Sequence, residues 1–171
     1  MLSCSKNLEK DDYIRWVRDY SNGLHVVKRA SPYSFDLQYQ PAEYLSVITD
    51  GSVAQPQNDL QYYTLKINVD DPTIDIIQHQ ATDAANKQQL IYYYSYLFEQ
   101  DIFLEEDSLK MPCVLYHAEQ TDLRKTRTFV LAFENTKVTS EETVLVIQSP
   151  HFGSLPIKIR VSKKNIPTLK L

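Results

Sequence analysis

The stretch YSFDLQYQ, residues 33–40, decides the fold because apolar and polar side chains alternate strictly along it. The apolar positions are Tyr33, Phe35, Leu37 and Tyr39, and the polar ones are Ser34, Asp36, Gln38 and Gln40. A period of two is typical of a β-strand with one buried and one solvated face. The turn Ala30-Ser31-Pro32 joins this strand to the preceding run LHVVKRA, so residues 24–40 are expected to form a β-hairpin that ends at Pro41.

Strand patterns dominate the rest of the chain as well. In residues 60–69, LQYYTLKINV, the side chains of Tyr63, Leu65, Ile67 and Val69 are expected to face one way. Beyond residue 100 the sequence predicts a short strand at 101–106 and two hairpins, which pair 113–120 with 126–134 and 143–149 with 155–161. The last residues, 165–171, read as a short edge segment.

Two segments show helical spacing. A short N-terminal helix is expected within residues 10–24, and a long helix is expected around residues 82–99. The apolar stripe of the long helix consists of Leu90, Ile91, Tyr94, Leu97 and Phe98. The element order predicts an α+β fold with a mainly antiparallel sheet, arranged either as a β-sandwich or as a sheet backed by the long helix. Residues 1–10 are expected to be an N-terminal tether and residues 11–171 one globular domain.

Composition excludes several classes of function. The net charge is −4 and the basic residues are scattered, so no nucleic-acid partner is expected. Three glycines in 171 residues cannot supply a glycine-rich phosphate loop. No run approaches the ~20 apolar residues of a membrane span. The four histidines have no metal-ligand spacing, and the acidic groups at 70–71, 105–107 and 141–142 read as solvated turns, so neither a metal nor a cofactor is expected.

His117 and Glu119 are the candidate site residues of the folded part. They lie two apart on a predicted strand and therefore share a face, where a histidine could act as a general base oriented by a carboxylate. Cys113 falls on the same face, but four residues of strand span ~13 Å, too far for a hydrogen bond to His117. A hydrolase using His117 and Glu119 is thus one alternative, and a polar sheet face is the more ordinary interpretation.

Cys4 carries the sharper functional signal. The residues Leu2-Ser3-Cys4, followed by the polar run SKNLEKDD, resemble the site at which bacterial lipoproteins are cleaved and lipidated. The segments YIRWVRDYSNGLHVVKRASPYSFDLQYQPAEYL, MPCVLYHAEQ, TFVLAFE and IPTLKL are similar to lipoproteins of the Bacteroidota whose activity is unassigned. That resemblance covers most of the chain and carries over no catalytic residues.

The resemblance implies a lipid on Cys4 and a place in the cell envelope, on the periplasmic or surface side of a membrane. The protein is then expected to be a binding or structural component rather than an enzyme, with a protein or a glycan as partner. If Met1 is instead the true start, Cys4 is an ordinary residue of the N-terminal tail. A cytosolic partner-binding protein is the alternative in that case.

Overall fold

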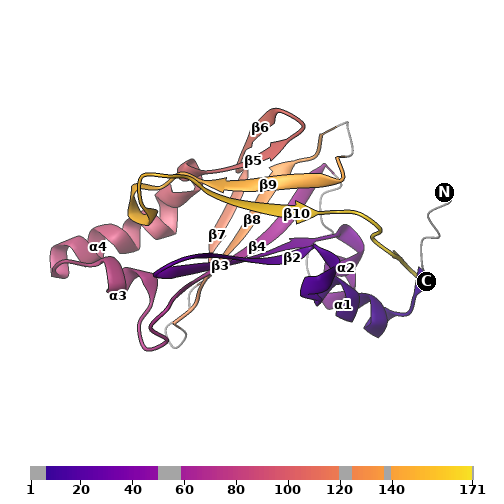
Figure 1. Ribbon diagram of the computed structural model, residues 1–171, viewed down its shortest axis with the longest axis horizontal. Coiled ribbons are helices and arrows are strands. Elements are labelled where there is room, and N and C mark those ends of the chain that lie inside the picture. The colour runs from indigo at the N-terminus through magenta and orange to yellow at the C-terminus, as the bar shows by residue number, and fades with distance from the viewer. Residues whose placement is uncertain (1–6, 50–58, 120–124, 137–139, 171) are drawn as a thin grey trace.

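Two antiparallel β-sheets carry the fold in the part of the chain that the computed structural model describes, residues 7–49, 59–119, 125–136 and 140–170. The five-stranded sheet has the order β2 (His25–Ala30), β3 (Tyr33–Gln40), β4 (Leu60–Val69), β8 (Arg127–Glu134) and β7 (Leu115–Ala118). The four-stranded sheet has the order β10 (Ile157–Ser162), β9 (Glu142–Ile147), β5 (Ile102–Glu106) and β6 (Leu109–Pro112). The predicted hairpins β2–β3, β7–β8 and β9–β10 are all present (Figure 1).

The core lies between the two sheets. In the five-stranded sheet the buried Leu65 of β4 is opposite Leu37 on one side and Phe129 on the other. In the four-stranded sheet Leu145 is flanked in the same way by Leu104 and Ile159. Each such side chain contributes about 1.5–3 kcal/mol by leaving water. The structure confirms the α+β fold with mainly antiparallel sheets, and the arrangement is that of a sandwich.

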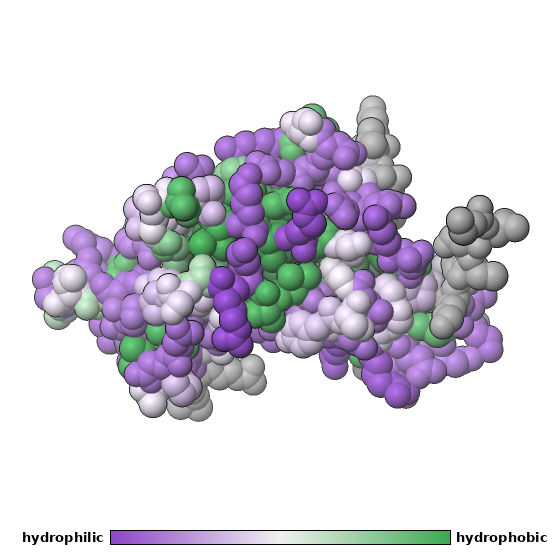
Figure 2. Space-filling model, in the orientation of Figure 1, coloured by the Kyte–Doolittle hydropathy of each residue, from purple (hydrophilic) through white to green (hydrophobic). Residues whose placement is uncertain are grey.

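One edge of the sandwich is a groove between β2 and β10. The backbone N–H of Ser162 donates to the carbonyl of Gly23 over 3.0 Å, which brings the sheets together at one end of this edge. Farther along, the edges enclose a groove of about 410 Å³, lined by Val26, Val27, Lys28, Glu105, Val144, Lys158, Ile159 and Arg160. Figure 2 shows hydrophobic surface gathered here, crossed by hydrophilic side chains. The apolar floor of the groove therefore continues the core toward solvent.

The helices gather at the two ends of the sandwich (Figure 1). Helices α1 (Lys10–Arg18) and α2 (Ala42–Ile48) lie at one end, and α3 (Ile76–Gln80) and α4 (Ala84–Tyr92) lie at the other. Helix α3 begins at a complete capping box, in which Asp75 accepts from the backbone N–H of Gln78 and the Gln78 side chain accepts from that of Asp75. Short α3 is thereby stabilised by its cap as well as by packing.

The predicted long helix is helical from residue 84 to residue 101 but not regular. Helix α4 passes into a π-helical turn, Tyr93–Leu97, and then into a 3-10 turn, Phe98–Asp101. It begins at residue 84 because the Asp83 side chain accepts from the backbone N–H of Asn86. Of the predicted stripe, Leu90, Tyr94 and Phe98 are buried and Ile91 is exposed. The segment therefore covers one end of the sandwich rather than the face of a sheet.

The two ends of the described chain lie together. Strand β1 (Asn7–Leu8) pairs in parallel with β11 (Thr168–Leu169), and the Lys170 ammonium donates to Glu9 over 2.7 Å. We refer to this β1–β11 pairing as the terminal clasp. Residues 7–10 of the expected tether thus belong to β1 and to the start of α1, because β11 offers them a partner strand.

Candidate functional site

The predicted hydrolase residues lie apart from one another on the outside of the sandwich. His117 is in edge strand β7 opposite Val130, and both its side chain and that of Glu119 are exposed. Among the described residues, no hydrogen bond joins these two side chains. The inward positions of this strand are taken by Tyr116 and Ala118, which pack against the core. The geometry therefore shows no hydrogen bond by which Glu119 could orient His117 as a general base, and no pocket that both side chains line among those described.

Cys113 is a poor nucleophile in this structure. Its thiol is half-buried and donates to the carbonyl oxygen of Leu115 over 3.0 Å. Burial raises the pKa of the Cys113 thiol to about 11, so the reactive thiolate is scarce at neutral pH. Cys4 lies outside the described residues, so its expected lipidation stays a prediction.

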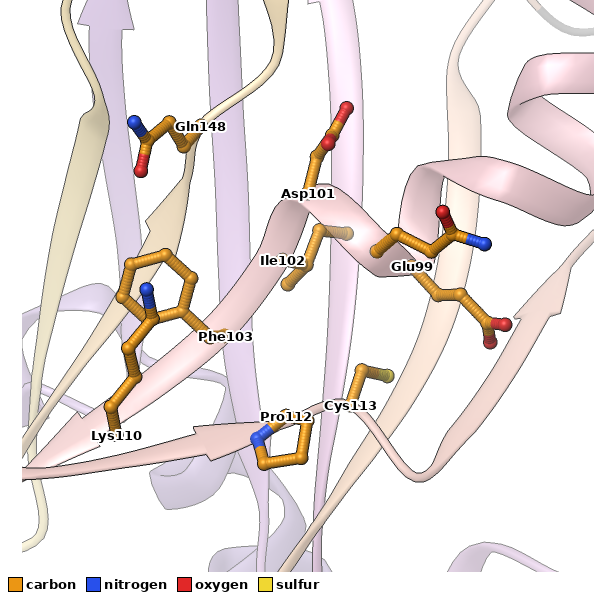
Figure 3. Close-up of a pocket in the computed structure, with 9 residues that line it drawn as sticks. Glu99, Asp101, Ile102, Phe103, Lys110, Pro112, Cys113 and Gln148 are labelled. Atoms are coloured by element: carbon orange, nitrogen blue, oxygen red, sulfur yellow. The ribbon is translucent and has the colours of Figure 1, made fainter.

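Cys113 lines a hollow of about 610 Å³ (Figure 3). The Lys110 ammonium lies 3.6 Å from the centre of the Phe103 ring, a cation–π contact. Asp101 lines the same hollow but accepts a short hydrogen bond from the Tyr93 hydroxyl. The hollow thus offers an aromatic ring and polar groups for contact. Burial keeps the thiol of Cys113 protonated and therefore poorly reactive.

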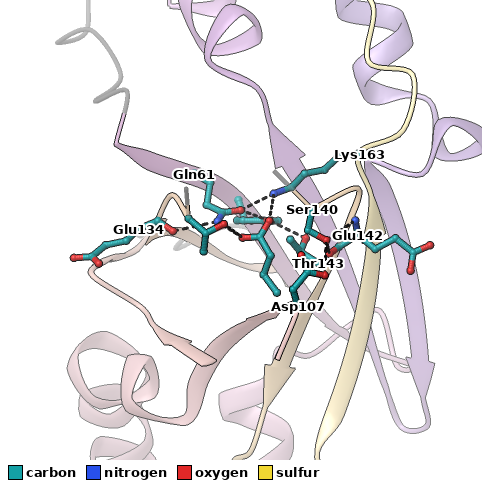
Figure 4. Close-up of polar contacts among 10 residues, drawn as sticks. Gln61, Asp107, Glu134, Ser140, Glu142, Thr143 and Lys163 are labelled. Carbon is teal, nitrogen blue, oxygen red and sulfur yellow. Dashed lines mark hydrogen bonds and ion pairs between the residues drawn. The ribbon is translucent and has the colours of Figure 1, made fainter. Parts of the chain in front are cut away.

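A buried polar network connects the two sheets near the residues where β4 begins. It is the most complete candidate site (Figure 4). Gln61 of β4, only 2 % exposed, donates to the Glu106 carboxylate over 3.3 Å and to the carbonyl of Glu134 over 3.2 Å. Tyr63 donates to Gln61 Oε1 over 2.9 Å, and Thr143 lies 3.0 Å from the same hydroxyl. Burial raises the pKa of Tyr63 well above its usual value, so the phenol stays protonated and can donate.

Glu106 is the buried charge of this network. It is 4 % exposed and ends β5, where Ile102, Leu104 and Glu106 alternate on the inner face. Besides Gln61, its carboxylate accepts from the Thr136 hydroxyl over 3.1 Å. The expectation that residues 105–107 form only a solvated turn is therefore wrong for Glu106, because strand alternation turns that side chain inward.

Lys163 completes the site and belongs to the end of the four-stranded sheet, which also carries Glu106. It follows β10, and its ammonium donates to Gln61 Oε1 over 2.7 Å and lies 4.0 Å from Glu106. The amine also lies 4.7 Å from the centre of the Tyr39 ring. Burial lowers the pKa of Lys163 to about 8, and the negative charge of Glu106 opposes this shift. A lysine that is partly neutral at physiological pH differs from an ordinary surface lysine in its chemistry.

The Lys163 site opens into a pocket of about 410 Å³. Its lining consists of Tyr39, Glu106, Asn135, Thr136, Ser140, Glu141, Lys163 and Ile166. The pocket combines one amine, one buried carboxylate, hydroxyl groups and an apolar wall. Such a mixture of a few polar groups and a ring is typical of small-molecule sites.

Sequence reasoning missed this site, although a signal for it was present. The alternation predicted for Tyr63, Leu65 and Ile67 extends back to Gln61, and that of Ile102 and Leu104 extends on to Glu106. A polar residue in phase with a buried apolar series indicates a buried polar group that needs partners. The sequence around Lys163 does not indicate which strands its side chain contacts.

The comparisons with known proteins add no assignment to this geometry. A scan against protein-family models found no match to the chain, and searches of curated proteins and of solved structures found none either. Within the described residues, no group of three or more His, Cys, Asp or Glu side chains is placed to hold a metal ion. None of the helices in that same part of the chain is long and apolar enough to cross a membrane.

A second titratable cluster ties the N-terminal helical region to the sheet. His25 Nε2 lies 2.6 Å from Asp36 Oδ1, and His25 Nδ1 lies 2.8 Å from the carbonyl of Arg18. The Tyr20 ring stacks on the imidazole at 3.8 Å, and its hydroxyl donates to Asp36 over 2.9 Å. Since both ring nitrogens face acceptors, the doubly protonated imidazolium satisfies the geometry best.

The His25–Asp36 pair predicts a pH-dependent stability. Burial lowers the pKa of His25, but the hydrogen bonds to Asp36 and Arg18 outweigh it, so the pKa is raised above the ordinary 6.5. Burial raises the pKa of Asp36, but bonding to His25 and Tyr20 outweighs it, so the pKa falls below 3.8. The pair therefore stabilises the fold most between about pH 4 and 6.5, and the effect is lost as pH rises through the folded pKa of His25.

The measurement is urea unfolding of wild type and of His25→Gln across this range. The variant is expected to be less stable by about 1 kcal/mol near pH 5.5, with the gap closing toward pH 8. His117→Gln, at an exposed position of β7, is the matched control and should leave the pH profile unchanged. A gap for His25→Gln that grows with pH would contradict the assignment.

Proposed function

We propose that this protein is a lipid-anchored component of the cell envelope, held through Cys4 and working as a binding domain. The observation that carries the proposal is the context of Cys4, with Leu2 and Ser3 before it and a polar run after it. The terminal clasp supports it, because β1 begins only three residues beyond the cysteine. A lipid on Cys4 would therefore hold the folded domain close to the membrane surface.

Binding is favoured over catalysis by the placement of the candidate residues. His117 and Glu119 are exposed and not joined to each other, and Cys113 is protected by burial. At the end of the molecule away from α1 and α2, Tyr92 of α4 and Tyr96 of the π-helical turn are 57 % and 64 % exposed (Figure 1). Exposed tyrosine rings suit contact with a protein or with the apolar faces of a glycan.

The test is metabolic labelling of the full gene, with its upstream sequence, in a Bacteroidota host grown on an alkyne-tagged fatty acid. The labelled protein is expected to partition into detergent, since each buried acyl methylene contributes about 0.8 kcal/mol of membrane affinity. Cys4→Ala should lose both the label and the partitioning. Cys113→Ala, which removes the other cysteine, is the matched control and should keep both.

Two outcomes would contradict the proposal. Cys4→Ala protein that labels and partitions like wild type would show that the lipid, if any, is elsewhere. Wild-type protein that stays unlabelled and soluble in the host would favour the cytosolic partner-binding alternative. Circular dichroism of the purified variants confirms that neither substitution has unfolded the domain.

A further inference from the structure

The Lys163 site carries an inference that does not depend on the lipid anchor. An ammonium has three donor hydrogens, and Lys163 uses one of them on Gln61 Oε1 at 2.7 Å. Among the described residues the next acceptor is Glu106, at 4.0 Å, which is beyond hydrogen-bond distance. The amine is thus largely removed from water, incompletely bonded, and part of the wall of a 410 Å³ pocket (Figure 4).

The charges around the pocket restrict the ligand. An anionic ligand would be repelled by Glu106 and Glu141, both of which line the pocket. A cationic ligand would be repelled by the ammonium of Lys163, which lies 4.0 Å from the buried carboxylate. A neutral ligand with a polar end and an apolar body is repelled by neither the carboxylates nor the ammonium. Tyr39 and Ile166 supply the apolar contact for it.

We propose that this pocket captures a small aldehyde or ketone as an imine on Lys163. The amine nitrogen attacks the carbonyl carbon, and the C=O π-bond becomes the hydroxyl of a carbinolamine. The carbon–oxygen bond then breaks, the oxygen leaves as water with both nitrogen protons, and a C=N bond remains. No oxidant or reductant is needed, and hydrolysis by water reverses the step.

Glu106 is a positioning residue in this proposal. Its carboxylate is held by Gln61 and Thr136 and lies 4.0 Å from the amine, so it acts on the charge of the amine through space rather than through a hydrogen bond. Its negative charge also favours the ammonium form and thereby raises the pH at which the amine becomes neutral. Removing that charge should shift the reaction to lower pH.

Lys164 provides an internal control. It is the next residue in the chain, but its side chain is half exposed and its ammonium is 3.6 Å from Glu141, an exposed ion pair. Both lysines therefore see the same reagent in the same molecule. Lys163 is largely buried and lines the pocket, whereas Lys164 is half exposed and is not among the residues that line it.

The experiment treats the full 171-residue chain with benzaldehyde and sodium cyanoborohydride, which reduces any imine to a stable secondary amine. Peptide mapping by mass spectrometry then gives the rate at each lysine. At about pH 7.5 Lys163 should be modified at least about tenfold faster than Lys164, because burial lowers the pKa of Lys163 to about 8 and its amine lines the pocket that would hold the aldehyde. The rate at Lys163 should also saturate with benzaldehyde, as expected of a pocket, whereas the rate at Lys164 should rise linearly.

Equal rates at the two lysines, or a Lys163 rate without saturation, would overturn the proposal. Glu106→Gln should move the pH midpoint of Lys163 modification downward. An unchanged midpoint would show that the charge of Glu106 does not act on the Lys163 amine. The comparison of the two adjacent lysines within one protein, resolved by fragment ions, stands even if a pocket variant fails to fold. Using Cys4→Ala protein throughout separates this result from that of the lipid-labelling experiment, because the pocket contains no residue near Cys4 in the sequence.

Discussion

Replacing Phe98 with alanine is expected to lower the free energy of unfolding by about 3–5 kcal/mol, the range for a large aromatic removed from a packed core. Phe98 is fully buried at the start of the 3-10 turn that ends the long helical segment. Its ring contacts those of Tyr93, Tyr94, Tyr116, Phe129 and Phe152, with centroid distances of 5.2–6.4 Å. These rings come from the helical segment, from β7 and β8, and from the turn before β10, so one cavity would weaken every contact among them.

Urea unfolding followed by tyrosine fluorescence and by circular dichroism measures the loss. Tyr96→Ala is the matched control, because Tyr96 belongs to the same helical segment and is exposed. That variant should change stability by no more than about 0.5 kcal/mol. If Phe98→Ala stayed within about 1 kcal/mol of wild type, the aromatic cluster would not be the part of the core that holds the helical segment.

Asp75→Ala is expected to destabilise the protein by about 3 kcal/mol because one carboxylate serves two structural purposes. It caps α3 by accepting from the backbone N–H of Gln78 over 2.8 Å. It also accepts from Arg127 of β8, whose Nε donates over 2.9 Å and whose Nη2 makes a second, short bond. Removing the carboxylate leaves an uncapped helix and a partly buried guanidinium without its counter-charge.

Asp83→Ala separates the two contributions. Asp83 caps α4 because its carboxylate accepts from the backbone N–H of Asn86 over 2.7 Å, and among the described residues its side chain makes no other hydrogen bond. Its loss should therefore cost about 1 kcal/mol, the usual worth of a cap. Thermal and urea unfolding of both variants give the comparison, and equal losses would show that the Arg127 pair adds nothing to the cap.

The local alternation of apolar and polar residues was sufficient to predict most of the strands. The alternation in residues 33–40 is a property of neighbouring residues, and burying one face of that segment requires no knowledge of the rest of the chain. The hairpins followed from turns next to such segments. The helix beginning at residue 84 was also visible, because Asp83 can cap it from its own side chain.

Features that depend on distant partners were not predictable in the same way. The terminal clasp joins residues 161 apart, and neither two-residue strand has a pattern of its own. The Lys163 site needs Gln61 from one sheet and Glu106 from the other, and only the packing of the sandwich brings them together. His117 was placed correctly on a strand, whereas Glu119 lies one residue beyond its end, and nothing local revealed that this strand lies at an edge.

The terminal clasp also has a consequence for the order in which the protein is made. Strand β1 leaves the ribosome well before its partner β11, which comes 161 residues later in the chain. The pairing cannot close before synthesis has reached residue 169. Throughout elongation, the start of the chain therefore lacks the contact that later holds it against the domain.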